Sequence, residues 1–163
     1  MSRAFVREGD SEESLPERAV SSQPNFVTAR GLAQLESRLR ELERELSEAR
    51  AAGERQRLAE VERDLRYYAA RRASAQLVGP PSVGERAAGG PAEPVQLRFG
   101  MQARVRMPDG VERSFRVVGE DEAEPAVGLV SHASPLARAL LGHAAGDVVT
   151  FGAGELEVLS IGS

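Results

Sequence analysis

Hydrophobic positions between residues 28 and 78 follow the spacing of a helical coiled coil. Apolar side chains recur there at alternating steps of three and four residues, which is the pattern of a heptad seam. The pattern is interrupted once, at Gly53. The seam comprises Leu32, Leu35, Leu39, Leu42, Leu46 and Ala49 before this glycine, and Leu58, Val61, Leu65 and Tyr68 after it, with the weaker positions Arg72 and Ala75 as its continuation. Two seams of similar length joined at a glycine predict an antiparallel helical hairpin over residues 26–78.

The start of this hairpin carries local signals. Thr28 precedes the first seam residue and is of a type that caps helices, so it is the predicted N-cap. Phe26 and Val27 come just before Thr28, and we expect them to pack against Leu32 as a hydrophobic staple. The second helix is expected to continue to residue 78, where a Gly-Pro-Pro sequence follows.

The period of the pattern changes in the second half of the chain. Short apolar runs that alternate with polar residues, separated by turns containing glycine and proline, predict strands. Ser134 and Pro135 are typical of the start of a helix, and Gly142 of its end. The predicted fold class is α+β, with the helical hairpin followed by a small antiparallel β-sheet domain that carries one short helix. The expected strands and apolar runs are 101–107, 111–119, 127–130, 148–151 and 155–161.

Two further segments contain few large apolar residues. Residues 1–25 are rich in acids and serines, and we predict a disordered acidic tail there. Residues 79–95 are rich in proline and glycine, and we predict a linker. The chain is thus expected to consist of this tail, a coiled coil over 26–78, the linker, and a sheet domain over 96–163.

Composition narrows the chemistry of this 163-residue chain. It has no cysteine, which excludes disulfide bonds, thiol nucleophiles and zinc fingers. Its formal net charge is -4, unlike the polycations that bind duplex nucleic acid directly. Its two histidines, His132 and His143, lack the spacing of a metal site, so we expect no metal, no cofactor and no catalytic residue. No apolar stretch is long enough for a membrane helix, so the expectation is a soluble, cytoplasmic protein.

The second half also contains four linked sequence motifs, at residues 99–100, 115–123, 134–142 and 146–149. Their order and spacing resemble the C-terminal domain of the GreA/GreB transcription elongation factors. The resemblance implies an N-terminal antiparallel coiled coil and a C-terminal FKBP-like domain, a layout that agrees with the periodicity. It also implies a partner, bacterial RNA polymerase. The C-terminal domain would dock at the rim of the secondary channel, and the coiled coil would enter it.

The resemblance also implies where the polymerase would be bound. In the family, the loop and helix start around a Ser-Pro motif are linked to polymerase binding, which corresponds here to Ser134, Pro135 and Leu136. Asp121 and Glu122 are expected to present negative charge to a basic surface of the polymerase, and the alternative is that they only form a solvated turn. Contact with nucleic acid would then be indirect, through the polymerase.

The chemistry of the family lies at the tip of the coiled coil, where a Gly-Asp-x-x-Glu-Asn sequence supplies two carboxylates. These carboxylates help to hold a Mg²⁺ ion that activates water to cut backtracked RNA. In this chain the glycine is Gly53 and Glu54 replaces the aspartate, but Arg57 stands at the position of the glutamate. A cation close to Glu54 repels Mg²⁺. The helices are also about a heptad shorter than those of the family, a loss of about 10 Å of reach.

We therefore expect a monomeric regulator of transcription elongation that binds RNA polymerase without stimulating RNA cleavage. Three alternatives remain open. A cleavage factor would have to combine Glu54 with Glu48 or Glu60 in place of the missing carboxylate. A peptidyl-prolyl isomerase is suggested by the FKBP-like fold, although a fold alone does not confer activity. A structural scaffold would dimerise through the leucine-rich seams instead of pairing them within one chain.

Overall fold

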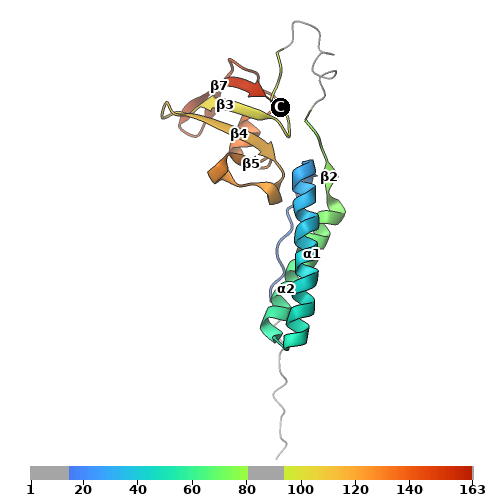
Figure 1. Cartoon of the computed structure of the whole chain (residues 1–163). Helices are drawn as coiled ribbons and strands as arrows, with labels where there is room; N and C mark the ends of the chain where they lie inside the picture. The colour runs from blue at the N-terminus through green and yellow to red at the C-terminus, as the bar shows by residue number, and fades with distance from the viewer. Residues whose placement is uncertain (1–14, 81–93, 163) are drawn as a thin grey trace, which may run out of the picture.

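The computed structural model describes residues 15–80 and 94–162, which form a helical hairpin and a β-sheet domain (Figure 1). The hairpin consists of α1, Ala29–Ala52, and α2, Arg55–Ser74. It extends away from the sheet domain, so that the turn between the two helices lies at the far end of the hairpin (Figure 1). A helical hairpin followed by a sheet domain with one short helix confirms the predicted fold class.

Both ends of α1 follow the local signals of the sequence. The Thr28 side chain accepts a hydrogen bond from the backbone N–H of Gly31 at 2.9 Å, so Thr28 is the N-cap. At the other end Gly53 has a φ of 69°, a left-handed conformation that glycine adopts without steric cost. The backbone N–H of Gly53 donates to the carbonyl of Arg50 at 3.3 Å. The chain therefore reverses direction at the glycine that the sequence indicates.

The hydrophobic seam is only partly buried, because each helix of a two-helix hairpin packs against a single partner. Four seam residues are buried, and the other apolar seam residues keep part of their surface exposed. At the end of α2 the burial pattern departs from the heptad, since Arg71 is buried there and the expected seam position, Arg72, is exposed. The fully buried seam residues are Leu35, Leu42, Ala49 and Val61.

The second helix ends earlier than expected. It stops at Ser74, and Gln76–Leu77 forms a short strand, β2, that pairs in parallel with β1, Phe26–Val27. The two segments that enter and leave the hairpin are thus tied together at its base. Phe26 and Val27, which the sequence suggests as a staple for α1, are part of this two-stranded sheet.

The sheet domain contains five strands in the spatial order β5-β4-β3-β7-β6. Neighbouring strands are antiparallel, as expected, except that β5 runs parallel to β4. This one strand differs because the connection after β4 passes through two 3-10 turns, η1 and η2, before β5 begins. The elements are β3 (Gln102–Arg106), β4 (Glu112–Val118), η1 (Glu120–Glu122), η2 (Pro125–Val127), β5 (Leu129–Ser131), α4 (Pro135–Leu140), β6 (Val148–Phe151) and β7 (Gly154–Gly162).

One hydrophobic core holds the sheet domain together. Its side chains alternate with exposed residues along β3, where Ala103 and Val105 are buried and Arg104 and Arg106 are exposed. The short helix α4 contributes two of the core residues. The buried core consists of Leu97, Met101, Ala103, Val105, Val117, Val130, Ala137, Leu140, Leu156 and Val158.

The last part of the predicted tail, residues 15–25, does not extend freely. Glu17 pairs with Arg66 of α2 at 2.6 Å, and the guanidinium of Arg18 lies 4.0 Å from the ring centre of Tyr67. The segment therefore runs alongside α2 (Figure 1), because its charged side chains find partners on that helix. Residues 15–25 thus contact α2, whereas the predicted tail would leave them without partners.

The rest of the predicted tail, residues 1–14, lies outside the described residues, as does most of the predicted linker, residues 81–93. Among the residues that the structure describes, no helix is both long enough and apolar enough to span a membrane.

Candidate functional site

The tip of the hairpin brings together the charged residues that the sequence analysis identifies. Glu54 follows Gly53 in the turn, and α2 begins at the next residue. Arg57, in the first turn of α2, lies between two carboxylates. Its Nη1 is 3.5 Å from Oε2 of Glu54, and its Nη2 is 3.8 Å from Oε2 of Glu48. The two acids at the tip therefore share one cation, and all three side chains are about half exposed.

This arrangement does not suit a divalent cation. Mg²⁺ requires oxygen ligands in near-octahedral geometry, whereas the guanidinium of Arg57 faces both carboxylates. The third acid that could serve, Glu60, instead accepts a hydrogen bond from Gln56 at 3.3 Å. Within residues 15–80 and 94–162, no group of three or more His, Asp or Glu side chains could hold a metal ion.

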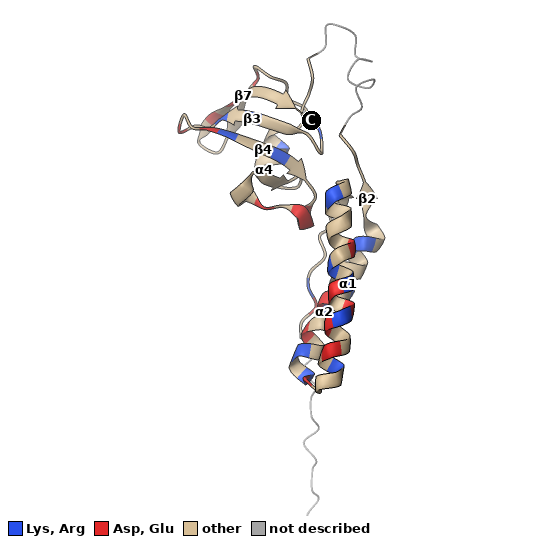
Figure 2. Cartoon of the chain, in the orientation of Figure 1, with Lys and Arg blue, Asp and Glu red and all other residues tan. Residues whose placement is uncertain are grey.

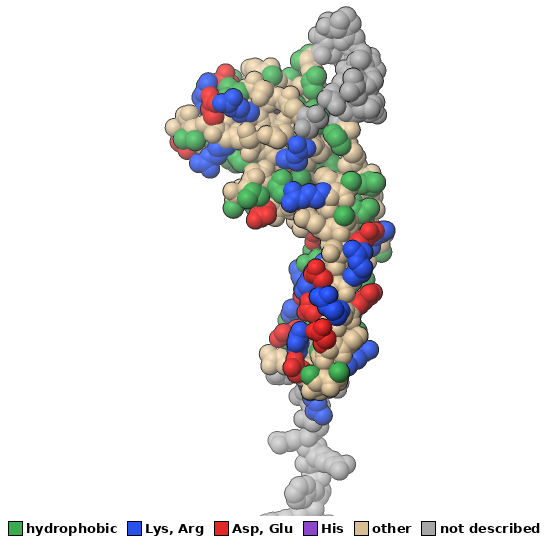
Figure 3. Space-filling model, viewed as in Figure 1, with side chains coloured by type: hydrophobic (Ala, Val, Ile, Leu, Met, Phe, Trp, Pro, Cys, Tyr) green, Lys and Arg blue, Asp and Glu red, His purple; other side chains and the backbone are tan. Residues whose placement is uncertain are grey.

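Charges of both signs alternate along the hairpin (Figures 2 and 3). Many of them form salt bridges within or between the helices, such as Arg38 with Glu45 at 2.9 Å. A surface groove of about 660 Å³ beside the tip is lined by charged residues of both helices, including Glu54 and Arg57. On the face seen in Figure 3 no patch of one sign covers the hairpin. The hairpin thus presents mixed charge, which is unlike a surface that binds a nucleic acid backbone.

The predicted docking residues lie at the start of α4. Ser134 caps this helix, because its Oγ accepts a hydrogen bond from the backbone N–H of Ala137 at 3.2 Å. Pro135, the first helical residue, is exposed, whereas Leu136 is partly buried and packs against the core of the sheet domain. Of the three residues, Pro135 therefore offers the most accessible surface to a partner.

Asp121 and Glu122 lie in η1, which packs against α1 of the hairpin. Glu122 is only 8% exposed, and its Oε2 accepts a hydrogen bond from the Thr28 hydroxyl at 2.5 Å. A Cβ atom on Gly31 would lie 2.7 Å from the same oxygen, so the glycine permits the close approach of Glu122 to α1. Presentation of these acids to a partner stays a prediction. The structure gives them a different role, in the joint between the hairpin and the sheet domain.

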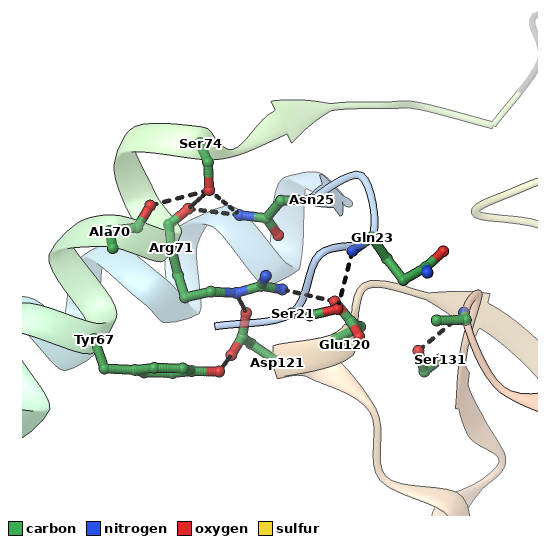
Figure 4. A network of polar contacts seen from close by, with 11 residues as sticks. Ser21, Gln23, Asn25, Tyr67, Ala70, Arg71, Ser74, Glu120, Asp121 and Ser131 are labelled. Atoms are coloured by element: carbon green, nitrogen blue, oxygen red, sulfur yellow. Dashed lines mark hydrogen bonds and ion pairs between the residues drawn. The ribbon is translucent and has the colours of Figure 1, made fainter. Parts of the chain in front are cut away.

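Arg71 of α2 is the main residue of this joint that the sequence analysis missed. Its side chain is 1% exposed and lies against the acids of η1 (Figure 4). Its Nε donates to Oδ2 of Asp121 at 2.5 Å, and its Nη2 donates to Oε2 of Glu120 at 3.3 Å. Tyr67, one turn earlier, donates its hydroxyl to Oδ1 of Asp121 at 2.7 Å. Burial, together with the hydrogen bond and charge of Asp121, raises the pKa of Tyr67 to about 12, so the hydroxyl keeps the proton that it donates.

One sequence signal points to such a cation. Three consecutive acids, Glu120–Glu122, follow β4 after the single residue Gly119. Acids of this kind need a cationic partner if they are buried. Nothing in the heptad pattern identifies Arg71 as that partner, because the seam spacing leads to Arg72 and leaves Arg71 outside the seam.

Aromatic rings complete the joint on the side of β1. The ring of Phe26 lies 5.9 Å from that of Phe99 and 5.3 Å from that of His132, measured between ring centres. Burial lowers the pKa of His132, whose Nε2 has no hydrogen-bond partner among the described residues. A Cβ atom on Gly119 would lie 2.5 Å from the carbonyl oxygen of Phe26, so the backbone of η1 touches the backbone of β1.

The sequence of this chain is similar to known proteins along most of its length. Residues 93–163 match the family described as "Transcription elongation factor, GreA/GreB, C-term". The transcription elongation factor GreB of Yersinia pestis is 33% identical over 144 residues, which cover 77% of this chain and 79% of that protein. The chain belongs to the GreA/GreB family. The transcription elongation factor GreA of Listeria welshimeri is 46% identical to this GreA/GreB-family chain over 46 residues, which cover 28% of the chain and 29% of that protein.

Two solved structures match this GreA/GreB-family chain along most of its length, with low superposition scores. GreA factor homolog 1 of Thermus thermophilus is 22% identical, with 86% of this chain and 100% of that chain covered and a TM-score of 0.37. The elongation factor GreA/GreB from Nitrosomonas europaea is 18% identical, with 85% and 98% covered and a TM-score of 0.39. At these TM-scores the two structures support no argument about the joint, which rests on the contacts of this chain alone.

Proposed function

We propose that this Gre-family chain binds bacterial RNA polymerase at the secondary channel, through its sheet domain, and does not stimulate RNA cleavage. The hairpin would enter the channel with a tip that lacks the metal-binding pair of carboxylates. The observation that carries the proposal is the position of Arg57 between Glu48 and Glu54.

The charge at the tip argues against the recruitment of Mg²⁺. Two acids, Glu48 and Glu54, stand beside three arginines, Arg50, Arg55 and Arg57. A guanidinium stays charged at every physiological pH, so the positive charge of Arg57 cannot be removed by titration. A Mg²⁺ ion would have to displace Arg57 from both carboxylates and would still be repelled by the neighbouring arginines.

The length of the hairpin supports the same conclusion. Helix α1 contains 24 residues, which corresponds to about 36 Å at the rise of an α-helix. An additional heptad in each helix, which the family resemblance implies for the longer arms, would extend the reach of the hairpin by about 10 Å. A hairpin that binds in the channel at this length stops short of the position that a longer arm would occupy.

The proposal places the docking surface on the sheet domain, because this part of the chain matches the family profile. Within it, Pro135 is exposed on a helix whose start is fixed by the Ser134 cap. A rigid, exposed residue of this kind suits a binding surface, because little conformational entropy is lost when it contacts a partner.

A competition assay on backtracked elongation complexes tests the proposal. A cleavage-stimulating GreB protein is held at a fixed concentration, and this chain is titrated in. We expect the rate of RNA cleavage to fall toward the rate without GreB, because the chain would occupy the channel and add no cleavage. An unchanged rate would show that the chain does not compete for the channel. A rising rate would favour the alternative, a genuine cleavage factor.

Two matched variants locate the docking surface in the same assay. Pro135→Asp should shift the competition curve to higher concentrations, while the new acid is compatible with the first turn of α4. Val111→Asp introduces the same residue at an exposed apolar position in the turn between β3 and β4, and should leave the curve unchanged. Equal curves for the two variants would place the docking surface away from α4.

A further inference from the structure

The joint between the hairpin and the sheet domain concentrates buried charge. Burying an arginine costs free energy unless its charge is paired and its N–H groups are hydrogen-bonded, and Arg71 meets both conditions through Asp121 and Glu120. Such a pair contributes little net stability compared with an apolar contact of the same size. Its best-attested use is to select one arrangement of the parts that it joins.

We propose that Arg71 is a positioning residue, which holds the hairpin to the sheet domain in one orientation. We call the four residues that make the decisive contacts the clasp. The clasp consists of Arg71, Asp121, Glu122 and Thr28.

The clasp holds both helices at once. Asp121 accepts from Arg71 on α2, while its neighbour Glu122 accepts from Thr28 at the start of α1. Two adjacent residues of one short turn therefore form hydrogen bonds with residues of two different helices, one at the start of α1 and one in α2. A rotation of the hairpin about either helix would stretch at least one of these contacts, so the pair fixes direction as well as attachment.

Two glycines allow the hairpin and the sheet domain to approach each other closely. Gly119 leaves no space for a Cβ atom beside the carbonyl oxygen of Phe26, which is a contact between two backbones. Gly31 leaves no space for a Cβ atom beside the carboxylate of Glu122. The backbone contact at Gly119 is lost with a small displacement, so it favours one orientation of the two parts.

The segment 15–25 contacts both α2 residues that bind Asp121, Tyr67 and Arg71. Arg18 lies over the Tyr67 ring at 4.0 Å, and the hydroxyl of this ring donates to Asp121. Asn25, which is 5% exposed, donates from its Nδ2 to the carbonyl oxygen of Arg71 at 2.6 Å (Figure 4). The residues that carry the clasp on α2 are therefore themselves held in place.

The use of the clasp in transcription rests on the proposed function. If the sheet domain docks on the polymerase, the clasp sets the direction in which the hairpin leaves the docking surface. The existence of the clasp does not depend on the polymerase, and it can be tested on the free protein.

Distance measurements between two spin labels test the proposal directly. The chain has no cysteine, so Ala52→Cys at the hairpin tip and Ala153→Cys in the turn between β6 and β7 accept labels at two unique, exposed positions. The parent chain should give one narrow distribution of distances. With Arg71→Met added, we expect this narrow distribution to be lost, because the hairpin samples several directions. Circular dichroism under the same conditions should show that both parts remain folded.

Matched controls separate positioning from general stability. Arg72→Met removes the same charge from the neighbouring, exposed position and should keep the narrow distribution. Gly119→Ala leaves all charges in place but forces the backbones of η1 and β1 apart, and should also broaden the distribution. Gly79→Ala, at a glycine with open space around its Cβ position, should not.

Each outcome decides the question. A narrow distribution in both Arg71→Met and Gly119→Ala would overturn the proposal, and so would equal broadening in Arg72→Met. If Arg71→Met fails to fold, Gly119→Ala and the milder Tyr67→Phe, which removes only the hydroxyl bound to Asp121, provide the same test. Failure of the chain to compete with GreB while these results hold would reject the proposed function and leave the clasp intact.

Discussion

The tip and the base of the hairpin use the same chemical pair in opposite surroundings. At the tip, Arg57 faces Glu48 and Glu54 across 3.8 and 3.5 Å, and all three side chains are about half exposed. At the base, Arg71 meets Asp121 at 2.5 Å, with side-chain exposures of 1% and 14%. Water screens the first set of charges and is nearly excluded from the second.

This difference separates two effects of an arginine. Exposed ion pairs contribute about 0.2–1 kcal/mol, so Arg57 has little influence on folding and acts through the local field that a metal ion would meet. Removal of one partner from a buried pair costs about 3–5 kcal/mol, so Arg71 acts on the arrangement of the molecule. On the two proposals above, the tip determines whether the hairpin can bind Mg²⁺, and the base determines the orientation of the hairpin.

The largest expected effect is the loss of Arg71. Arg71→Met should lower the free energy of unfolding by roughly 3 kcal/mol, the lower end for a buried pair, because Asp121 keeps 14% exposure and can regain some water. Arg72→Met, whose exposed arginine pairs with Glu36, should cost less than about 1 kcal/mol. Urea denaturation of both variants measures the difference. Equal losses in the free energy of unfolding would mean that the buried arginine contributes no more to stability than the exposed one.

Next in size is the effect of the two N-caps. Thr28→Ala removes a helix cap and also the hydroxyl that donates to buried Glu122, so we expect a loss of roughly 2 kcal/mol. Ser134→Ala removes only a cap and should cost about 1 kcal/mol. Thr28→Ser, which keeps the hydroxyl, serves as the control. Urea denaturation showing equal losses for the two alanine variants would argue that the bond from Thr28 to Glu122 adds nothing.

A smaller effect concerns pH at the base. Burial lowers the pKa of His132 below 6.5, and the charge of Glu120 offsets only part of this shift. As the pH falls, the folded chain therefore binds fewer protons at this histidine than the unfolded chain. The resulting stability is present above about pH 6.5 and is lost as the pH falls through the lowered pKa. His132→Phe, which keeps an aromatic ring beside Phe26, should lose less stability on acidification than the parent chain. Melting curves recorded from pH 7.5 downward test this, and parallel losses in the two proteins would contradict it.

The smallest effect is expected at the tip. Arg57→Met should change the free energy of unfolding by less than about 0.5 kcal/mol, because its partners are half exposed and regain water. Urea denaturation beside the Arg71→Met variant makes the contrast direct. A loss at the tip as large as that at the base would remove the distinction between the two regions.

Local patterns in the sequence predict most of the fold. The heptad seam, the Thr28 cap and Gly53 are enough to predict the hairpin and its turn, because each depends on neighbours within a few residues. The alternation of Ala103 and Val105 with arginines predicts the buried face of β3 for the same reason.

The joint could not be predicted in this way, because its partners are far apart in the sequence. Arg71 meets Asp121 fifty positions later, and the heptad phase places the seam at Arg72 instead. Residues 15–25 have the composition of a free tail, yet charged partners on α2 hold them. Gly53, Glu54 and Arg57 lie together at the tip because they are neighbours in the sequence. The place of Glu122 in the joint depends instead on long-range packing.

The central claim is that this hairpin reaches the polymerase without the chemistry to cut RNA. The most direct test is the rate of RNA cleavage in backtracked elongation complexes at a concentration of this chain that saturates binding, with Mg²⁺ present. We predict that the cleavage rate with this chain equals the rate of the polymerase alone. The variant with both Glu54→Asp and Arg57→Glu should give the same rate, because its arm would remain about a heptad short. Rescue should require both acids together with one added heptad in each helix. Strong Mg²⁺-dependent cleavage by the unmodified chain would contradict the account.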